Sequence, residues 1–236
     1  MISGVAFCPH PPLLVPEVAA GAAAELDDLR GACRAAIARI AAPVHRLVLL
    51  GAGPVSRAHA PSARGAFAGY GVTLDVTLGE SRSSAPTALP LSLTVGAWLV
   101  RDTFGPDAGA IAFEVGPDFG PTDKALSALA IGRASCALLV MGDGSARRST
   151  AAPGYLDERA EAFDAGVADA LRSGVGYRLN QPLLDSDAIA PELLCASVPV
   201  WQEVAGLTEA ARWRAELLYE GAPYGVGYFV AAWTAR

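Results

Sequence analysis

Short runs of apolar residues alternate along the chain with stretches that have helical periodicity. Residues 2–8 form an apolar run that ends at a proline, and residues 46–51 and 136–141 are almost continuously apolar. Such runs are typical of strands buried on both faces of a sheet. Apolar positions spaced three and four apart predict a helix over residues 17–40.

The remaining chain continues this alternation. We expect further strands at residues 72–78, 110–115 and 224–233, and further helices at residues 91–104, 123–130 and 155–171, while the type of residues 212–220 stays open. The pattern contains no internal repeat. It predicts one α/β domain over residues 1–236, with a mostly parallel central sheet and helices on both faces.

Ligand sites in such folds lie at the carboxyl ends of the strands. Three strand ends carry residues of interest: 8–10, 50–54 and 141–147. We therefore expect any site to form where these three segments meet.

Composition and charge narrow the class of protein. The chain is 52% hydrophobic and 18% charged, which favours a folded domain over disorder. Its net charge of −6 and lack of a basic run argue against nucleic-acid binding. There is no uninterrupted apolar stretch of membrane-spanning length and no basic leader, so we expect a cytoplasmic protein without a membrane partner. Four dispersed cysteines indicate buried, reduced thiols.

The three histidines are the first candidates for metal binding or acid–base chemistry. His10 lies between prolines at the end of the first strand, where a rigid loop suits a metal ligand. Its position alone favours a hydrogen-bonded or solvated loop histidine. His45 precedes the second strand, so we expect a structural role at the opposite end of the sheet. His59 follows the second strand end; a structural or solvent-facing role is favoured, although it could reach the same site as His10.

Residues 141–148 form a turn rich in small residues after a buried strand. Its glycine N–H groups, with Arg147, fit an anion site. Ser145 as a nucleophile is a weak hypothesis, because Arg147 replaces the glycine expected two residues after the serine. A plain tight turn that includes Asp143 is the default. Near the last strand, the Glu220 carboxylate beside a Gly/Pro turn could hold a metal or a ligand.

Three segments in the same order carry a resemblance to a known superfamily. They are residues 6–17 (AFCPHPPLLVPE), 138–145 (LLVMGDGS) and 222–229 (APYGVGYF). Together they resemble the catalytic, LigB-type subunits of class III extradiol ring-cleavage dioxygenases and the related Memo-like proteins. The resemblance spans most of the chain. It implies a LigB-like α/β fold and, in active members, a non-haem Fe(II) bound by two histidines and a glutamate, with a further histidine as acid/base.

The resemblance assigns the first iron ligand to His10. The second ligand place falls on Pro54 or its neighbour, and His59 lies five residues beyond Pro54. The glutamate that usually precedes Ala-Pro-Tyr-Gly is replaced by Gly221, with Glu220 one position early. Neither proline nor glycine offers a side-chain atom that can bind iron, so the resemblance implies an incomplete metal site.

The acid/base place after Gly-Asp-x-Ser is Ala146, which cannot transfer a proton; losing such a group typically slows a reaction about 10²–10⁴-fold. We therefore expect a LigB-fold protein that binds a small molecule or a protein at the former active-site cleft, without a cofactor. The ligand would be small and aromatic or anionic, and the family allows a homo-oligomer. The expected cleft residues are Pro54, Asp143, Ser145, Arg147 and Tyr224.

The alternative is a metal-dependent enzyme with a rearranged site. In that case His10, His59, Glu220 and Asp143 would converge on a single Fe(II) or Zn ion. The sequence leaves open whether any catalytic activity remains.

Overall fold

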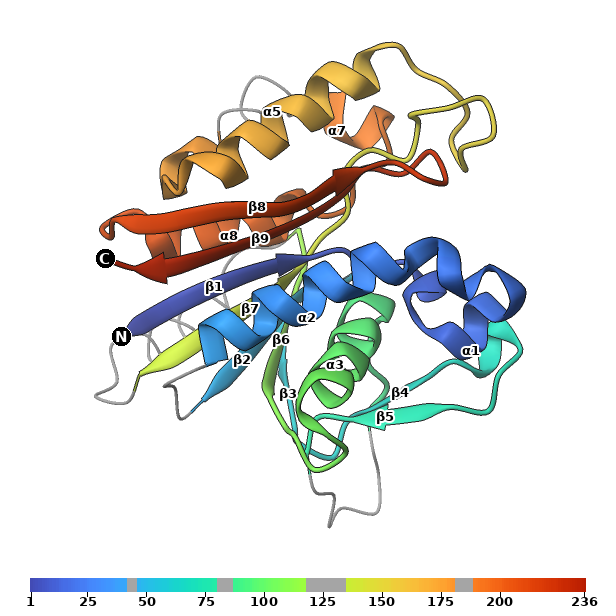
Figure 1. The fold of residues 1–236 in the computed structure, drawn as a ribbon. Coiled ribbons are helices and arrows are strands. Elements are labelled where there is room, and N and C mark those ends of the chain that lie inside the picture. The colour runs from blue at the N-terminus through green and yellow to red at the C-terminus, as the bar shows by residue number, and fades with distance from the viewer. Residues whose placement is uncertain (42–45, 80–86, 118–134, 181–188) are drawn as a thin grey trace.

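The computed structural model describes residues 1–41, 46–79, 87–117, 135–180 and 189–236. Figure 1 shows the arrangement of helices, strands and 3-10 helices (η). In chain order the elements are β1 (Ile2–Cys8), η1 (Pro12–Leu14), α1 (Pro16–Ala19), η2 (Ala20–Leu26), α2 (Asp27–Ala41), β2 (Leu47–Ala52), β3 (Arg57–His59), β4 (Arg64–Ala66), η3 (Ala68–Tyr70), β5 (Asp75–Thr77), α3 (Leu91–Phe104), β6 (Ile111–Val115), β7 (Cys136–Met141), α5 (Arg159–Ser173), η4 (Gly176–Leu179), α7 (Ile189–Glu192), α8 (Val198–Thr208), β8 (Trp213–Gly221) and β9 (Tyr228–Ala235).

The described strands form a seven-stranded mixed sheet and a separate two-stranded sheet. The order in the main sheet is β3-β6-β2-β7-β1-β9-β8. The four central strands, β6, β2, β7 and β1, are parallel, whereas β3, β9 and β8 each pair antiparallel with their neighbours. The expected mostly parallel sheet is therefore wrong, because three of its six strand pairs are antiparallel.

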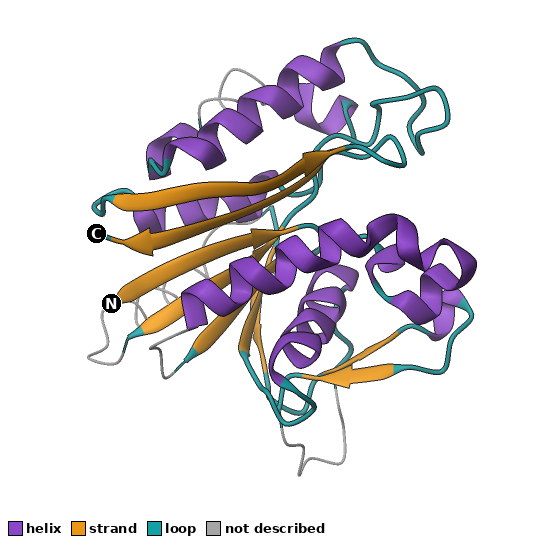
Figure 2. Cartoon of the chain, in the orientation of Figure 1, coloured by secondary structure: helices purple, strands orange, loops and turns teal. Residues whose placement is uncertain are grey.

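Connection length explains the antiparallel edges. Only residues 222–227 join β8 to β9, and only residues 53–56 join β2 to β3. A parallel connection needs a crossover of about a dozen residues or more, so these short links reverse the chain direction. The hairpin at the C-terminal end of the chain is added beside β1, as Figure 2 shows.

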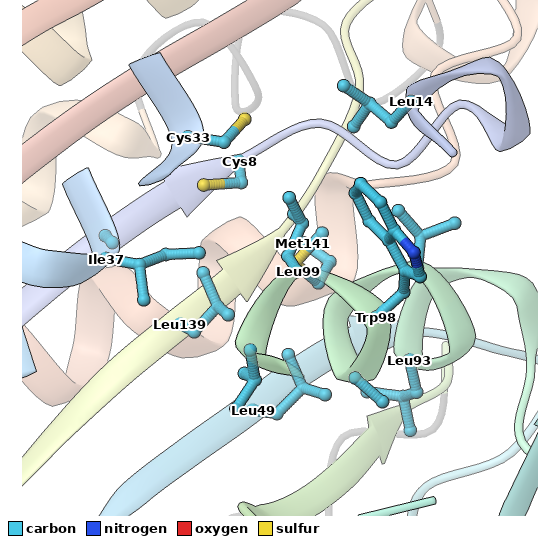
Figure 3. Packing of buried hydrophobic residues seen from close by; sticks show 14 of the residues in the cluster. Cys8, Leu14, Cys33, Ile37, Leu49, Leu93, Trp98, Leu99, Leu139 and Met141 are labelled. Atoms are coloured by element: carbon cyan, nitrogen blue, oxygen red, sulfur yellow. The ribbon is translucent and has the colours of Figure 1, made fainter. Parts of the chain in front are cut away.

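Both faces of the central sheet are apolar and covered by helices. In β7, Leu138 and Val140 belong to a core cluster that includes α5 and α8 side chains, whereas Leu139 and Met141 belong to one that includes α2 and α3 side chains. Figure 3 shows the second cluster, where Leu139 and Met141 lie beside residues of both helices. Among the described residues, no helix is both long and apolar enough to span a bilayer.

Several elements agree closely with the sequence pattern. The strands predicted at residues 2–8 and 136–141 and the helix at 91–104 are confirmed. The helix expected over residues 17–40 is instead three helical pieces, because Ala20 has a φ of 49° that interrupts the first turn. All four cysteines are buried free thiols, as predicted.

Other expectations are revised or lie beyond the described chain. The strand expected at residues 72–78 shortens to β5, which pairs with β4 in the small sheet rather than at the edge of the main one. Of residues 212–220, left open by the sequence, all but Arg212 belong to β8. The predicted helix at 123–130 and the predicted structural role of His45 fall outside the described residues.

Candidate ligand site at the carboxyl edge of the sheet

His10 and Asp143 meet at the carboxyl edge, although 133 residues separate them in sequence. Their strands are adjacent and parallel, with Cys8 opposite Met141, so the loops that follow leave the sheet side by side. The backbone N–H of His10 donates a hydrogen bond of 2.7 Å to Asp143 Oδ1. The ring nitrogen Nδ1 lies 3.5 Å from the same oxygen.

The position of Asp143 is also defined from its other side by the segment that leads into α8. The backbone N–H of Asp143 donates to Ser197 Oγ at 2.8 Å, and Cys195 Sγ donates to the Asp143 carbonyl at 3.5 Å. Burial raises the pKa of the Asp143 carboxyl, and the neighbouring His10 partly opposes that shift. Burial also raises the pKa of the Cys195 thiol to about 12, so this thiol is protonated and unreactive at neutral pH.

The His10 ring is only partly accessible. Nδ1 is buried and makes no hydrogen bond to any described residue, yet the side chain as a whole is 14% exposed. A proton on Nδ1 would face the Asp143 carboxylate, which favours the tautomer whose lone pair is on Nε2. The buried Tyr228 phenol is another neighbour of Asp143, and burial together with that carboxylate raises its pKa.

Ser145 does not act as an exposed nucleophile. It is fully buried, and its N–H and hydroxyl donate to the two carboxylate oxygens of Asp164, both at 2.8 Å. Arg148 Nη1 approaches the same carboxylate at 3.1 Å. The anion bound by this turn is therefore an internal side chain. Gly144 is required there, because a Cβ would lie 2.6 Å from Asp164 Oδ1.

Two of the remaining predicted cleft residues, Arg147 and Tyr224, make contacts elsewhere. Arg147 Nη1 donates to the Glu192 carbonyl at 2.8 Å, which anchors the turn to α7. The Tyr224 hydroxyl donates to Glu25 Oε2 at 2.9 Å across the same edge. Pro54 is exposed just beyond the end of β2. Among the described residues, neither Arg147 nor Tyr224 makes a hydrogen bond or ion pair with His10.

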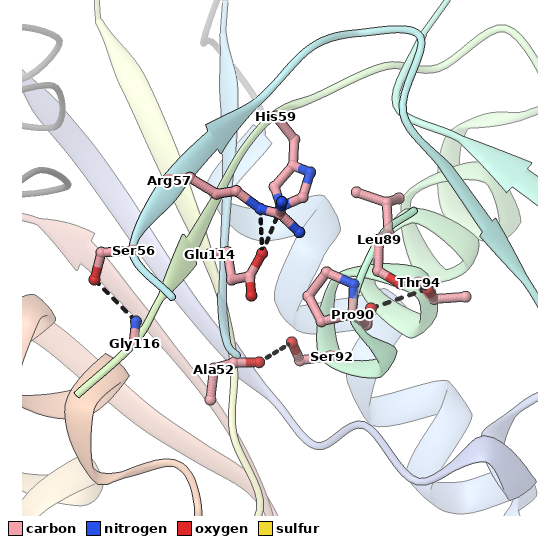
Figure 4. A network of polar contacts seen from close by, with 10 residues as sticks. All are labelled: Ala52, Ser56, Arg57, His59, Leu89, Pro90, Ser92, Thr94, Glu114 and Gly116. Atoms are coloured by element: carbon pink, nitrogen blue, oxygen red, sulfur yellow. Dashed lines mark hydrogen bonds and ion pairs between the residues drawn. The ribbon is translucent and has the colours of Figure 1, made fainter. Parts of the chain in front are cut away.

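His59 belongs to a different, buried cluster (Figure 4). Its Nε2 lies 2.9 Å from Glu114 Oε2, and Arg57 Nε lies 2.8 Å from the same oxygen. Burial lowers the pKa of His59, and the hydrogen bond to Glu114 opposes that shift. Four inter-strand spacings separate β3 from β1, which places His59 roughly 19 Å from the β1 strand along the sheet.

Glu220 is also engaged elsewhere. Its carboxylate forms an exposed ion pair of 3.0 Å with Arg172 of α5. Among the described residues, no group of three or more His, Cys, Asp or Glu side chains has the geometry to hold a metal. The structure thus gives His59 and Glu220 partners other than His10, and convergence of the three on one ion stays the alternative hypothesis. The described residues do not bring together the two histidines and one glutamate that the resemblance implies for Fe(II).

Sequence reasoning missed three polar residues that organise the His59 cluster and the turn around Asp143. Glu114 lies within a predicted apolar strand, and Asp164 within a predicted amphipathic helix; each is almost fully buried. A carboxylate in an apolar pattern is itself a signal, because a buried charge needs partners. Ser197 had no comparable signal, since its role depends on the fold bringing α8 to the strand edge.

Comparison with known proteins gives a likeness of fold. No protein-family model matches the chain, and no curated protein matches it. Among solved structures, the chain is similar to the uncharacterised protein JW3007 from Escherichia coli K12, with a TM-score of 0.54 and 12% sequence identity. The match covers 99% of this chain and 100% of that one. Over essentially its whole length, the chain therefore shares the overall α/β fold of the Escherichia coli protein.

Proposed function

We propose that this chain is a LigB-fold protein that binds a small aromatic or anionic molecule around His10 at the carboxyl edge of the sheet, without cleaving an aromatic ring. The observation that carries the proposal is the juxtaposition of His10 and Asp143. Because Nδ1 is buried beside the Asp143 carboxylate, Nε2 is the ring nitrogen left for a ligand. Such a group can accept a hydrogen bond from a ligand hydroxyl or, when protonated, pair with an anion.

The same geometry supports a binding function more strongly than ring cleavage. The residues at the other family positions, Pro54, Ala146 and Gly221, offer neither a metal ligand nor a group that transfers protons. The acidic neighbour Glu220 is paired with Arg172. Binding needs only a few well-placed polar groups beside apolar walls, whereas the family reaction needs a complete metal site.

Ligand titrations monitored by NMR would test the proposal. Benzoate, phenol and inorganic phosphate serve as probes of the aromatic and anionic classes. We expect at least one probe to shift resonances of His10 and its neighbours. A His10→Ala substitution should weaken that binding about tenfold or more, the typical effect of losing one hydrogen bond to a charged group.

The His59→Gln variant is the matched control, because it removes an imidazole from a separate buried cluster. Probe binding should be unchanged in that variant. If the probes bind wild type and His10→Ala equally, His10 is not the centre of the site. The metalloenzyme alternative would be favoured by stoichiometric iron or zinc in protein purified without chelators, lost in His10→Ala, together with catechol-dependent oxygen uptake.

A further inference from the structure

Tyr228, the first residue of β9, is almost completely buried, with 3% of its surface exposed. Among the described residues, no group forms a hydrogen bond with its hydroxyl. A buried tyrosine or tryptophan usually finds a partner for its polar atom. The indole N–H groups of Trp213 and Trp233 follow that rule, because both donate to backbone carbonyls. The Tyr228 hydroxyl is therefore a buried donor that remains available to a ligand.

Strand pairing places Tyr228 beside the loop that carries His10. The strands β1 and β9 are antiparallel neighbours (Figure 1), and Phe7 lies opposite Ala231 at the end of their paired stretch. Counted three residues further along each chain, that register brings His10 opposite Tyr228. Directly opposed residues of antiparallel strands project from the same face. Cys8, two residues before His10, belongs with Tyr228 to the core cluster that includes α2 and α3 side chains, which agrees with a shared face.

The turn that carries Asp143 is bonded directly to the start of β9. Gly227, the residue before Tyr228, accepts a hydrogen bond of 2.7 Å from the Gly144 N–H, and its own N–H donates to the Ser145 carbonyl at 2.8 Å. The Asp143 carboxyl is close enough to raise the pKa of Tyr228, in addition to the larger effect of burial. Three segments of the chain therefore bring a phenol, an imidazole and a carboxyl group to one edge of the sheet.

The imidazole of His10 also has unused hydrogen-bonding capacity. Its Nδ1 makes no hydrogen bond, and its contact with Asp143 Oδ1 is 3.5 Å long. Within the part of the chain that the structure describes, no residue is hydrogen-bonded to Nε2. A phenol O–H is a donor at neutral pH, and the imidazole tautomer favoured by Asp143 has its acceptor at Nε2. One hydroxyl group of a ligand can satisfy both, because a hydroxyl accepts and donates at the same time.

The charged residues of this edge disfavour an anion. Asp143 contacts the imidazole, and a second acidic side chain, Glu25, accepts the hydroxyl of Tyr224. Two arginines of the region, Arg30 and Arg148, are already paired with aspartates. An anion that leaves water without a paired cation loses free energy, and acidic neighbours add to that loss. An uncharged hydroxyl group avoids both costs.

We infer that Tyr228 is a second ligand-binding residue of the His10 site, and that the pair selects an uncharged hydroxyl group over a carboxylate or a phosphate. The Tyr228 phenol donates a hydrogen bond to the ligand hydroxyl, and the ligand hydroxyl donates one to His10 Nε2. The inference rests on the function proposed above and deepens it. It names the donor of the site and decides between the aromatic and anionic classes of ligand, in favour of molecules that carry a neutral hydroxyl.

NMR titration of the full chain with phenol, benzoate and inorganic phosphate would test the inference. At about pH 7 phenol is uncharged and the other two probes are anions. We expect phenol to bind at least about tenfold more tightly than either anion. Tyr228→Phe, which keeps the ring and removes only the hydroxyl, should weaken phenol binding about three- to tenfold. Tyr177→Phe removes the hydroxyl of a half-exposed tyrosine on η4 and should leave phenol binding unchanged.

Thermal unfolding of the free protein separates a ligand-binding hydroxyl from a structural one. Tyr228→Phe should not lower Tm, because the hydroxyl has no partner in the described chain. A lower Tm, phenol binding unaffected by Tyr228→Phe, or an anion that binds as tightly as phenol would overturn the inference. The proposed function would still stand in those cases if binding is lost in His10→Ala. Failure of all three probes to bind wild type would overturn both.

Discussion

Among single residues, Asp164 determines the shape of the turn that carries Asp143. Its buried carboxylate accepts hydrogen bonds from the Ser145 N–H and hydroxyl and lies close to Arg148. Gly144 and Gly227 both pack against it without room for a side chain. The turn and the start of β9 therefore take their conformation from one carboxylate.

Asp164→Ala should be strongly destabilising. The substitution leaves two buried Ser145 donors and the Arg148 guanidinium without their acceptor, which typically costs about 3–5 kcal/mol. Urea unfolding would measure the change in free energy of unfolding. Asp169→Ala on the same helix is the control, since Asp169 is 77% exposed and its loss should change stability by about 0.5 kcal/mol or less. Similar effects of the two substitutions would contradict this role.

His59 makes the stability of the protein depend on pH. Burial lowers its pKa below the ordinary value of 6.5, so the unfolded chain binds a proton more readily than the folded one. This contribution to stability is present above about pH 6.5 and is lost as the pH falls through the folded pKa. Urea unfolding at about pH 7.5 and about pH 5.5 should show a loss of stability on acidification that is smaller in His59→Gln.

The decisive measurement for His59 is the change in the free energy of unfolding between the two pH values, compared between wild type and His59→Gln. Its lowered pKa predicts a difference between wild type and His59→Gln that appears only on acidification. An identical loss of stability in both proteins would mean that other groups account for the pH dependence. A constant difference at both pH values would indicate packing alone.

At the scale of elements, α3 lies exceptionally close to the central sheet. A Cβ at Gly96 would lie 2.5 Å from Leu49 Cδ1 and 3.0 Å from Met141 Cγ. A Cβ at Gly51 of β2 would lie 2.5 Å from Ser92 Oγ at the start of the helix. Glycines at these points allow the helix to approach β2, whose end leads into the turn at Pro54.

Gly96→Val should therefore destabilise the protein by about 1–3 kcal/mol, the typical effect of overpacking a core. Gly31→Ala in α2 is the matched control, because no atom lies within 4 Å of a Cβ placed there. That substitution should stabilise by about 0.5–1 kcal/mol, since alanine restricts the unfolded chain and favours helix. Thermal unfolding of the two variants gives the comparison. Equal stability of Gly96→Val and wild type would show that α3 can shift away from the sheet.

At the scale of the whole molecule, the mixed sheet decides which residues meet. The parallel centre brings the ends of β1 and β7 together, and with them His10 and Asp143. The antiparallel pairing of β3 places His59 at the far edge of the sheet. The α5 helix lies beside β8, and its Arg172 forms an ion pair with Glu220. Residues that a sequence motif groups as one metal site are thus distributed over three environments.

The sequence by itself determined the elements whose information is local. β1, β7 and α3 have continuous or periodic apolar patterns. The bounds of each element follow from its pattern, because the residues that become buried are consecutive or regularly spaced in the sequence. His10 was identifiable as a candidate because a proline-bounded loop follows the first strand.

Only the tertiary structure decided strand direction and side-chain partners. Residues 212–220 have no clear period, and from Trp213 onward they form β8 because pairing with β9 satisfies their backbone. The contacts of His10 with Asp143 and of His59 with Glu114 span 133 and 55 residues. Such pairs depend on strand order and helix placement, which local patterns of polarity do not specify. The need for burial selects apolar side chains at a position, but it does not determine which distant residue will lie beside that position.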